Sequence, residues 1–146
     1  MSVNSTYVAA PPEAVFDVLA DPESYGYWVP GSSKIRHADA DWPKPGSVFG
    51  HTQGVYGIGV KDTTEVIASE RPRTIVLEAR FRPFAINKVE LKLAPSGKGT
   101  KVVMVEYPTG GPAKVLHNPL MELALKLRNV EALRRLSKLA ESGRTR

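Results

Sequence analysis

Three polar side chains lie in strand-like segments with apolar neighbours and are candidates for chemistry: His51, Asp62 and Glu106. Side chains in a strand alternate between two faces, so His51 shares a face with Phe49 and Glu106 shares one with Met104. An imidazole and carboxylates beside an apolar pocket could exchange protons with a bound substrate, because burial and neighbouring charges shift their pKa values. This chemistry would suit an aldol cyclase or a dehydratase.

The same three residues also have structural explanations. If a hairpin turns around residues 56–57, His51 and Asp62 occupy neighbouring positions on adjacent strands and could hydrogen-bond to each other. Glu106 could instead meet Arg128 of the C-terminal segment. Both interpretations stay open, and the shortage of catalytic groups favours binding over catalysis.

Other reactive centres have little support in the sequence. It contains no cysteine, so disulfides, thiolate metal sites and cysteine nucleophiles are excluded. Its three histidines are scattered without a recognised ligand spacing, and the sequence predicts no metal and no cofactor. The glycines between Gly54 and Gly59 are typical of a turn rather than of a phosphate-binding loop, because no lysine-serine or lysine-threonine pair follows them. There is also no Gly-x-Ser-x-Gly motif of the hydrolase type.

The N-terminal part predicts short elements that end at prolines. Residues 2–9 are rich in strand formers, and Pro11-Pro12 ends that strand. A two-turn helix is predicted over residues 12–19, because Pro12 suits a first turn and apolar residues follow at helical spacing. A second short helix or turn is expected over residues 22–27, followed by a strand near residues 34–38.

Residues 47–107 alternate between apolar and polar side chains and predict five antiparallel strands. In the strand over residues 74–81, Ile75 and Leu77 share one face while Glu78 and Arg80 take the other. The sheet therefore has one apolar face and one face toward water.

The longest predicted element is a helix that starts between Pro112 and Pro119 and ends near Ser142. Its apolar residues follow at three- or four-residue spacing, which is typical of one continuous stripe. The first half is broader because Met121, Ala124 and Leu125 add to the stripe, and we expect this half to lie over a cavity. The stripe consists of Leu116, Leu120, Leu123, Leu127, Val130, Leu133, Leu136 and Ala140.

Several segments resemble the SRPBCC superfamily, which includes START lipid-transfer domains, the birch-pollen allergen and polyketide cyclase or dehydrase-like proteins. These segments are residues 10–21 (APPEAVFDVLAD), Trp28 before Pro30-Gly31, Gly99-Thr100, and residues 128–136 (RNVEALRRL). The last of them looks like the corresponding segment of uncharacterised bacterial members. The resemblance implies one α+β domain over residues 1–146 with the helix-grip fold. In that fold a curved antiparallel sheet of about seven strands surrounds a long C-terminal helix, and two short helices follow the first strand.

The resemblance and the shortage of catalytic groups together favour binding or carriage of a small hydrophobic ligand: a lipid, polyketide, isoprenoid or aromatic compound. The alternatives are a cyclase or dehydratase that uses His51, Asp62 or Glu106, and an interaction module with a basic helix end. The loops near Trp28, Tyr56 and Phe84 are the expected gates. The candidate ligand-binding residues are Trp28, Phe49, Tyr56, Leu77, Phe81, Phe84, Leu91, Met104, Met121 and Leu125.

The charge and hydropathy of the sequence indicate whether the protein binds nucleic acid, enters a membrane or is exported. The net charge is +5 with a pI near 9.6, but Glu131 and Glu141 interrupt the basic C-terminal segment, so no specific nucleic-acid site is predicted. The first residues lack a signal-peptide pattern, and no apolar stretch approaches about 18 residues. We therefore expect a cytoplasmic protein without stable membrane insertion, and a homodimer stays open.

Overall fold

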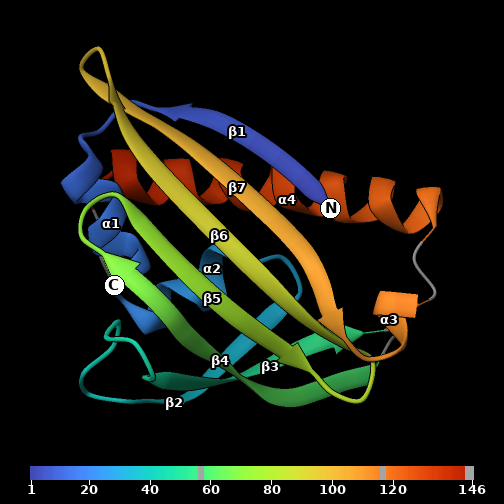
Figure 1. The fold of residues 1–146 in the computed structure, drawn as a ribbon. Coiled ribbons are helices and arrows are strands. Elements are labelled where there is room, and N and C mark those ends of the chain that lie inside the picture. Colours follow the sequence, from blue (N-terminus) through green and yellow to red (C-terminus); the bar gives the residue numbers. More distant parts are fainter. Residues whose placement is uncertain (56–57, 116–117, 144–146) are drawn as a thin grey trace.

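The computed structural model describes residues 1–55, 58–115 and 118–143. Seven strands, one long helix and several short helices follow each other in the predicted order (Figure 1). The elements are β1 (Ser2–Val8), α1 (Pro12–Leu19), the 3-10 helix η1 (Pro22–Ser24), α2 (Tyr25–Trp28), β2 (Ser32–Ala38), β3 (Val48–Val55), β4 (Ile58–Glu70), β5 (Thr74–Phe81), β6 (Ala85–Ser96), β7 (Gly99–Gly110), α3 (Pro112–Val115) and α4 (Pro119–Glu141).

The strands form one sheet in the order β1-β7-β6-β5-β4-β3-β2, and all neighbours are antiparallel. Each strand from β2 to β6 pairs with the next strand along the chain, whereas β1 joins the sheet beside β7. Figure 1 shows this curved sheet in front of α4, with α1 at one end and α2 behind the sheet. The predicted α+β helix-grip fold is confirmed.

Burial along the strands follows the predicted alternation. In β5, Ile75, Leu77 and Phe81 are buried on the concave face. Arg80 points the other way and forms ion pairs with Glu65 and Glu78. The apolar face of the sheet therefore turns toward the helices, as the sequence predicts.

The short helices are fixed to the rest of the fold through one carbonyl. The hydroxyl of Tyr25 and the indole Nε1 of Trp42 both donate hydrogen bonds to the Leu19 carbonyl, at 2.8 and 3.1 Å. Because Leu19 ends α1, these bonds tie α1 to α2 and to the loop that precedes β3. The position of Trp28 at the end of α2 follows from this anchoring.

The prediction of one continuous inward stripe on α4 is wrong. Leu133, Leu136 and Ala140 are buried, but four apolar residues of the first half are exposed, and Leu116 lies outside the described residues. In Figure 1 the first turns of α4 reach beyond β1. The exposed residues are Leu120 (76% exposed), Leu123 (53%), Leu127 (60%) and Val130 (53%).

Helix geometry explains this correction. Each residue turns the helix by about 100°, so a three-residue step falls about 60° short of a full turn. The steps from Leu127 to Val130, Leu133 and Leu136 are all of three residues, so the stripe rotates around the helix instead of following one side. The side of α4 that meets the sheet carries Asn129 and Ala132 instead.

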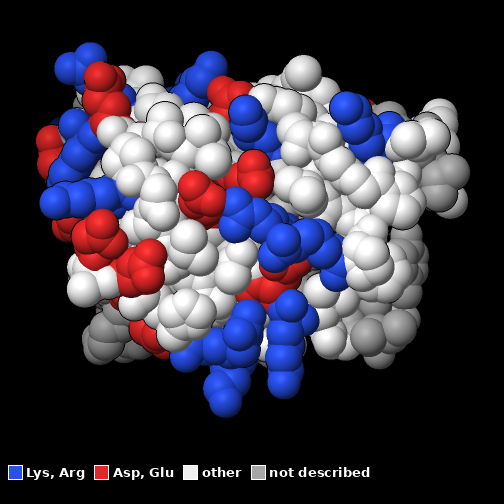
Figure 2. Space-filling view, turned by 60° about the horizontal axis from the view of Figure 1, so that its bottom comes forward, with Lys and Arg blue, Asp and Glu red and all other residues white. Residues whose placement is uncertain are grey.

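Figure 2 shows the face of the molecule that lies toward the bottom of Figure 1. Basic and acidic groups are interleaved there. No helix in the described part of the chain is long and apolar enough to span a membrane.

Candidate functional site

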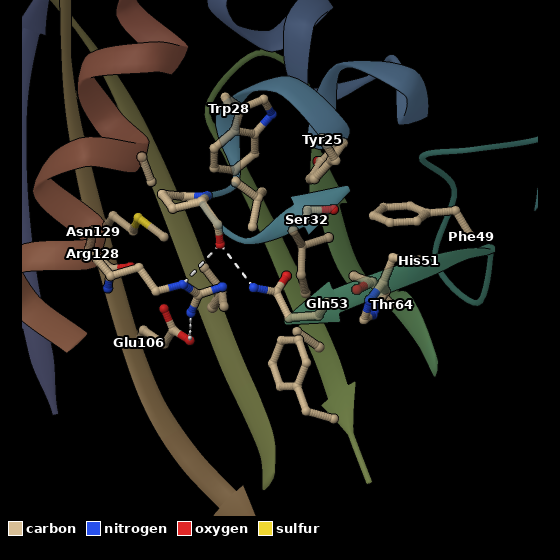
Figure 3. Close-up of a pocket in the computed structure, with 18 residues that line it drawn as sticks. Tyr25, Trp28, Ser32, Phe49, His51, Gln53, Thr64, Glu106, Arg128 and Asn129 are labelled. Atoms are coloured by element: carbon tan, nitrogen blue, oxygen red, sulfur yellow. Dashed lines mark hydrogen bonds and ion pairs between the residues drawn. The ribbon is translucent and has the colours of Figure 1, made fainter. Parts of the chain in front are cut away.

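A pocket lies between the concave face of the sheet, α2 and the middle of α4 (Figure 3). Its cavity volume is about 60 Å³. Eighteen of the described residues line it, and they come from β2 to β7, from α2 and the loop after it, and from α4. The pocket is therefore assembled from segments far apart in the sequence.

One wall of the pocket is aromatic. Tyr25 lies with its ring centroid 4.9 Å from those of both Trp28 and Phe49. The row continues from Phe49 to His51 over 5.9 Å, and from His51 to Phe81 over 5.5 Å. Tilted and edge contacts of this kind stabilise aromatic clusters, so the wall is a preformed apolar surface.

Another wall is polar and centres on the carbonyl of Pro30, in the loop after α2. Gln53 Nε2 donates a hydrogen bond to this oxygen at 2.9 Å, and Arg128 Nε approaches it at 3.4 Å. Figure 3 shows the two side chains reaching the Pro30 carbonyl from different sides. These contacts connect the loop to β3 and to α4.

Glu106 lies beneath Arg128 and is almost completely buried. Its position follows from alternation in β7, where Val102, Met104 and Glu106 all point inward. Its Oε2 accepts a hydrogen bond from Asn87 Nδ2 at 2.8 Å and lies 3.8 Å from Arg128 Nη1. The contact between Glu106 and Arg128, which would explain Glu106 structurally, is therefore present in the molecule.

His51 is buried with 3% of its surface exposed. Burial lowers its pKa, the backbone of Thr63 and the charge of Asp62 oppose this effect, and the charges of Arg36 and Arg128 add to it. The result is a neutral imidazole at neutral pH. Among the described residues, its Nε2 has no hydrogen-bond partner. A neutral ring with an unpartnered nitrogen can take up a proton as a base or accept a hydrogen bond from a ligand.

Asp62 pairs with His51 in the backbone register but turns to other partners. Its carboxylate accepts three hydrogen bonds from Arg82, at 2.6 to 3.0 Å, and one from the Thr63 amide at 2.8 Å. Burial raises the pKa of Asp62, but these bonds and the charge of Arg82 outweigh burial and lower it to about 2. Asp62 is not among the described lining residues, and these contacts take the place of the hydrogen bond to His51 that was one of the two open interpretations.

The proposed ligand-binding residues fall into two groups. Those that line the pocket are Trp28, Phe49, Leu77, Phe81 and Met104. Phe84, Leu91, Met121 and Leu125 are not among the described lining residues, and Tyr56 lies outside the described part of the chain. Leu91 is fully buried core, while Met121 and Leu125 are partly exposed and precede the described lining residues of α4, which begin at Arg128.

The polar lining residues Gln53, Arg128 and Asn129 are not among the site residues predicted from the sequence. Gln53 had a usable signal, since it lies two residues after His51 and shares its face of β3. Arg128 was considered only as a possible partner of Glu106, and Asn129 had no comparable signal, because the rotation of the apolar stripe concealed which side of α4 meets the sheet.

No group of three or more histidine and acidic side chains within residues 1–55, 58–115 and 118–143 is placed to hold a metal ion.

Comparison with known proteins gives a family and a fold. Residues 2–141 match the family model described as polyketide cyclase / dehydrase and lipid transport. No curated protein matches the sequence.

Solved structures resemble nearly the whole chain. Protein CV1439 from Chromobacterium violaceum is 20% identical with a TM-score of 0.73, and 95% of each chain is covered. Ara h 8.0201 is 14% identical with a TM-score of 0.73, and 96% of each chain is covered. The di-domain ARO/CYC StfQ from the steffimycin biosynthetic pathway is 13% identical with a TM-score of 0.71, over 96% of this chain and 50% of StfQ.

Proposed function

We propose that this chain, which belongs to the polyketide cyclase / dehydrase and lipid transport family, binds a small hydrophobic molecule in its pocket and carries it unchanged. The family match agrees with the resemblance to the SRPBCC superfamily. The observation that supports the proposal is the aromatic wall of Tyr25, Trp28, Phe49 and Phe81, opposite a few polar groups. Apolar walls with a small number of polar groups are typical of small-molecule sites.

The size of the pocket sets a condition on binding. Its volume of about 60 Å³ is smaller than that of an apolar cavity that binds benzene, about 150 Å³. A ligand with one or more rings therefore enters only if the pocket widens. The loop at Pro30 is suited to this movement, because its side-chain anchors are the 2.9 Å bond from Gln53 and the longer contact from Arg128.

A neutral fluorescent probe tests the proposal. N-phenyl-1-naphthylamine should brighten on binding to the wild type, and an excess of a neutral aromatic compound should displace it. Ala79→Leu adds volume inside the pocket and should weaken binding, whereas Ala94→Leu adds the same volume at an exposed position of β6. Absence of probe binding, or equal binding by both variants, would argue against the proposal.

A second candidate function is catalysis of the cyclase or dehydratase type. The observation in its favour is the neutral His51, whose unpartnered Nε2 lies in the same pocket as Glu106. Incubation with a linear poly-β-ketone separates the two functions. Carriage predicts recovery at unchanged mass, whereas aldol condensation would release one water and should be abolished by His51→Gln but retained in Asp62→Asn.

The third interpretation, an interaction module with a basic helix end, has less support. Arg134 and Arg135 both bind the carboxylate of Glu131, with nitrogen-to-oxygen distances of 2.7 Å. Their charges are therefore partly compensated within the helix.

A further inference from the structure

We infer that the Glu106 and Arg128 pair makes the pocket select an uncharged molecule with a carbonyl-type oxygen over a carboxylate of the same shape. The inference rests on the proposed function and specifies the chemistry of the occupant.

Arg128 has hydrogen-bonding capacity that the described residues of the protein do not use. A guanidinium carries five N–H donors, and charge-assisted hydrogen bonds are normally about 2.7–2.9 Å long. The two polar contacts of Arg128 among the described residues are longer, at 3.4 Å to the Pro30 carbonyl and 3.8 Å to Glu106. Donors are therefore available to an oxygen atom that enters the pocket.

The geometry also indicates where that oxygen would bind. Gln53 and Arg128 converge on the Pro30 carbonyl, so two donors already point at one acceptor (Figure 3). If the loop at Pro30 moves to admit a ligand, both donors lose this partner. A ligand carbonyl can then replace the Pro30 oxygen as their shared acceptor.

The charge balance of the pocket argues against an anionic ligand. Glu106 and Arg128 are the two charged residues among the described lining groups, because His51 is neutral, and their charges cancel. A ligand carboxylate near Arg128 would be attracted by the guanidinium but would also be repelled by the negative charge of the buried Glu106. An additional buried charge without its own partner is costly, whereas a carbonyl can accept the same hydrogen bonds without this penalty.

Acetophenone and benzoate test this selectivity, because they have nearly the same shape and differ in charge. Titrations followed by the amide and indole signals in NMR spectra should show acetophenone binding the wild type at least about tenfold more tightly than benzoate. Glu106→Gln retains an acceptor for Asn87 but removes the negative charge, and it should reverse the preference toward benzoate. Asp62→Asn removes one carboxylate outside the pocket and should leave the wild-type preference unchanged.

The possible failures can be distinguished. If the wild type binds N-phenyl-1-naphthylamine but binds benzoate as tightly as acetophenone, the selectivity inference is overturned and the proposed carriage stands. The inference is also overturned if folded Glu106→Gln keeps the wild-type preference. Binding of none of the three probes overturns both proposals. If Glu106→Gln does not fold, the wild-type comparison alone decides.

Discussion

The guanidinium of Arg128 and the carboxylate of Glu106 face each other inside the pocket, with 3.8 Å between Nη1 and Oε2. The first residue belongs to α4 and the second to β7, so this ion pair connects the helix to the sheet at the site itself. The same pair therefore contributes to the position of the helix, and it lines the pocket in which we propose that a ligand binds.

Breaking this pair from one side should destabilise the fold. Arg128→Met leaves the buried Glu106 without its charge partner and should cost about 2 kcal/mol of unfolding free energy, less than for a fully buried pair because Arg128 is partly exposed. The double variant Arg128→Met with Glu106→Leu removes both charges and should recover part of this loss. Urea unfolding measures both effects, and a double variant no more stable than Arg128→Met would contradict the argument.

The loop at the pocket entrance should be sensitive to a methyl group at Gly31. Gly31 has a φ of +87°, and an added Cβ would collide with Gln53 Nε2, the donor to Pro30. Gly46→Ala is the matched control, because Gly46 has a φ of +90° but open space around it. The control should lose about 1 kcal/mol from backbone strain alone, and Gly31→Ala should lose about 1 kcal/mol more. Equal losses in thermal or urea unfolding would show that the collision is unimportant.

The exposed apolar side of α4 should tolerate polar residues. Leu123→Gln and Leu127→Gln should each change the unfolding free energy by less than about 0.5 kcal/mol, because both side chains already contact water. Leu136→Ala, by contrast, creates a cavity beneath the same helix and should cost about 3 kcal/mol. A large loss in either glutamine variant would mean that this side of α4 is covered in solution, for example in a homodimer, and size-exclusion chromatography would detect such a dimer.

His51 should make stability depend on pH. Burial lowers its folded-state pKa below the ordinary value of about 6.5, so the unfolded chain binds the proton more readily. This contribution is fully present above about pH 6.5 and is lost as the pH falls through the folded-state pKa. Between about pH 7 and pH 5, His51→Gln should therefore lose less unfolding free energy than the wild type does. His37→Gln changes an exposed histidine, and its unfolding free energy should vary with pH as that of the wild type does. If the unfolding free energy of His51→Gln also varies with pH as that of the wild type does, the lowered pKa of His51 is contradicted.

Much of the fold could be predicted because its signals are local. Alternation defined the strands, the prolines at residues 11 and 12 separated β1 from α1, and parity placed His51 and Glu106 on the inward face. The inward side of α4 was harder to predict, since its apolar stripe rotates between Leu127 and Leu136.

Parts of the site depend on contacts that the sequence does not encode locally. Parity correctly put Asp62 on a buried face, but its partner Arg82 lies in the turn after β5 and draws the carboxylate away from His51. The convergence of Gln53 and Arg128 on Pro30 joins three distant segments. Such long-range polar contacts become visible only when the strands and helices are placed in space.

Native mass spectrometry of the protein purified from its own host tests the central claim most directly. We predict a recurrent adduct of an uncharged apolar molecule on the wild type and on Ala94→Leu, and its loss from Ala79→Leu, whose added methyl groups occupy the pocket. Repeated recovery of empty wild-type protein, or an adduct that persists unchanged in Ala79→Leu, would contradict carriage in this pocket.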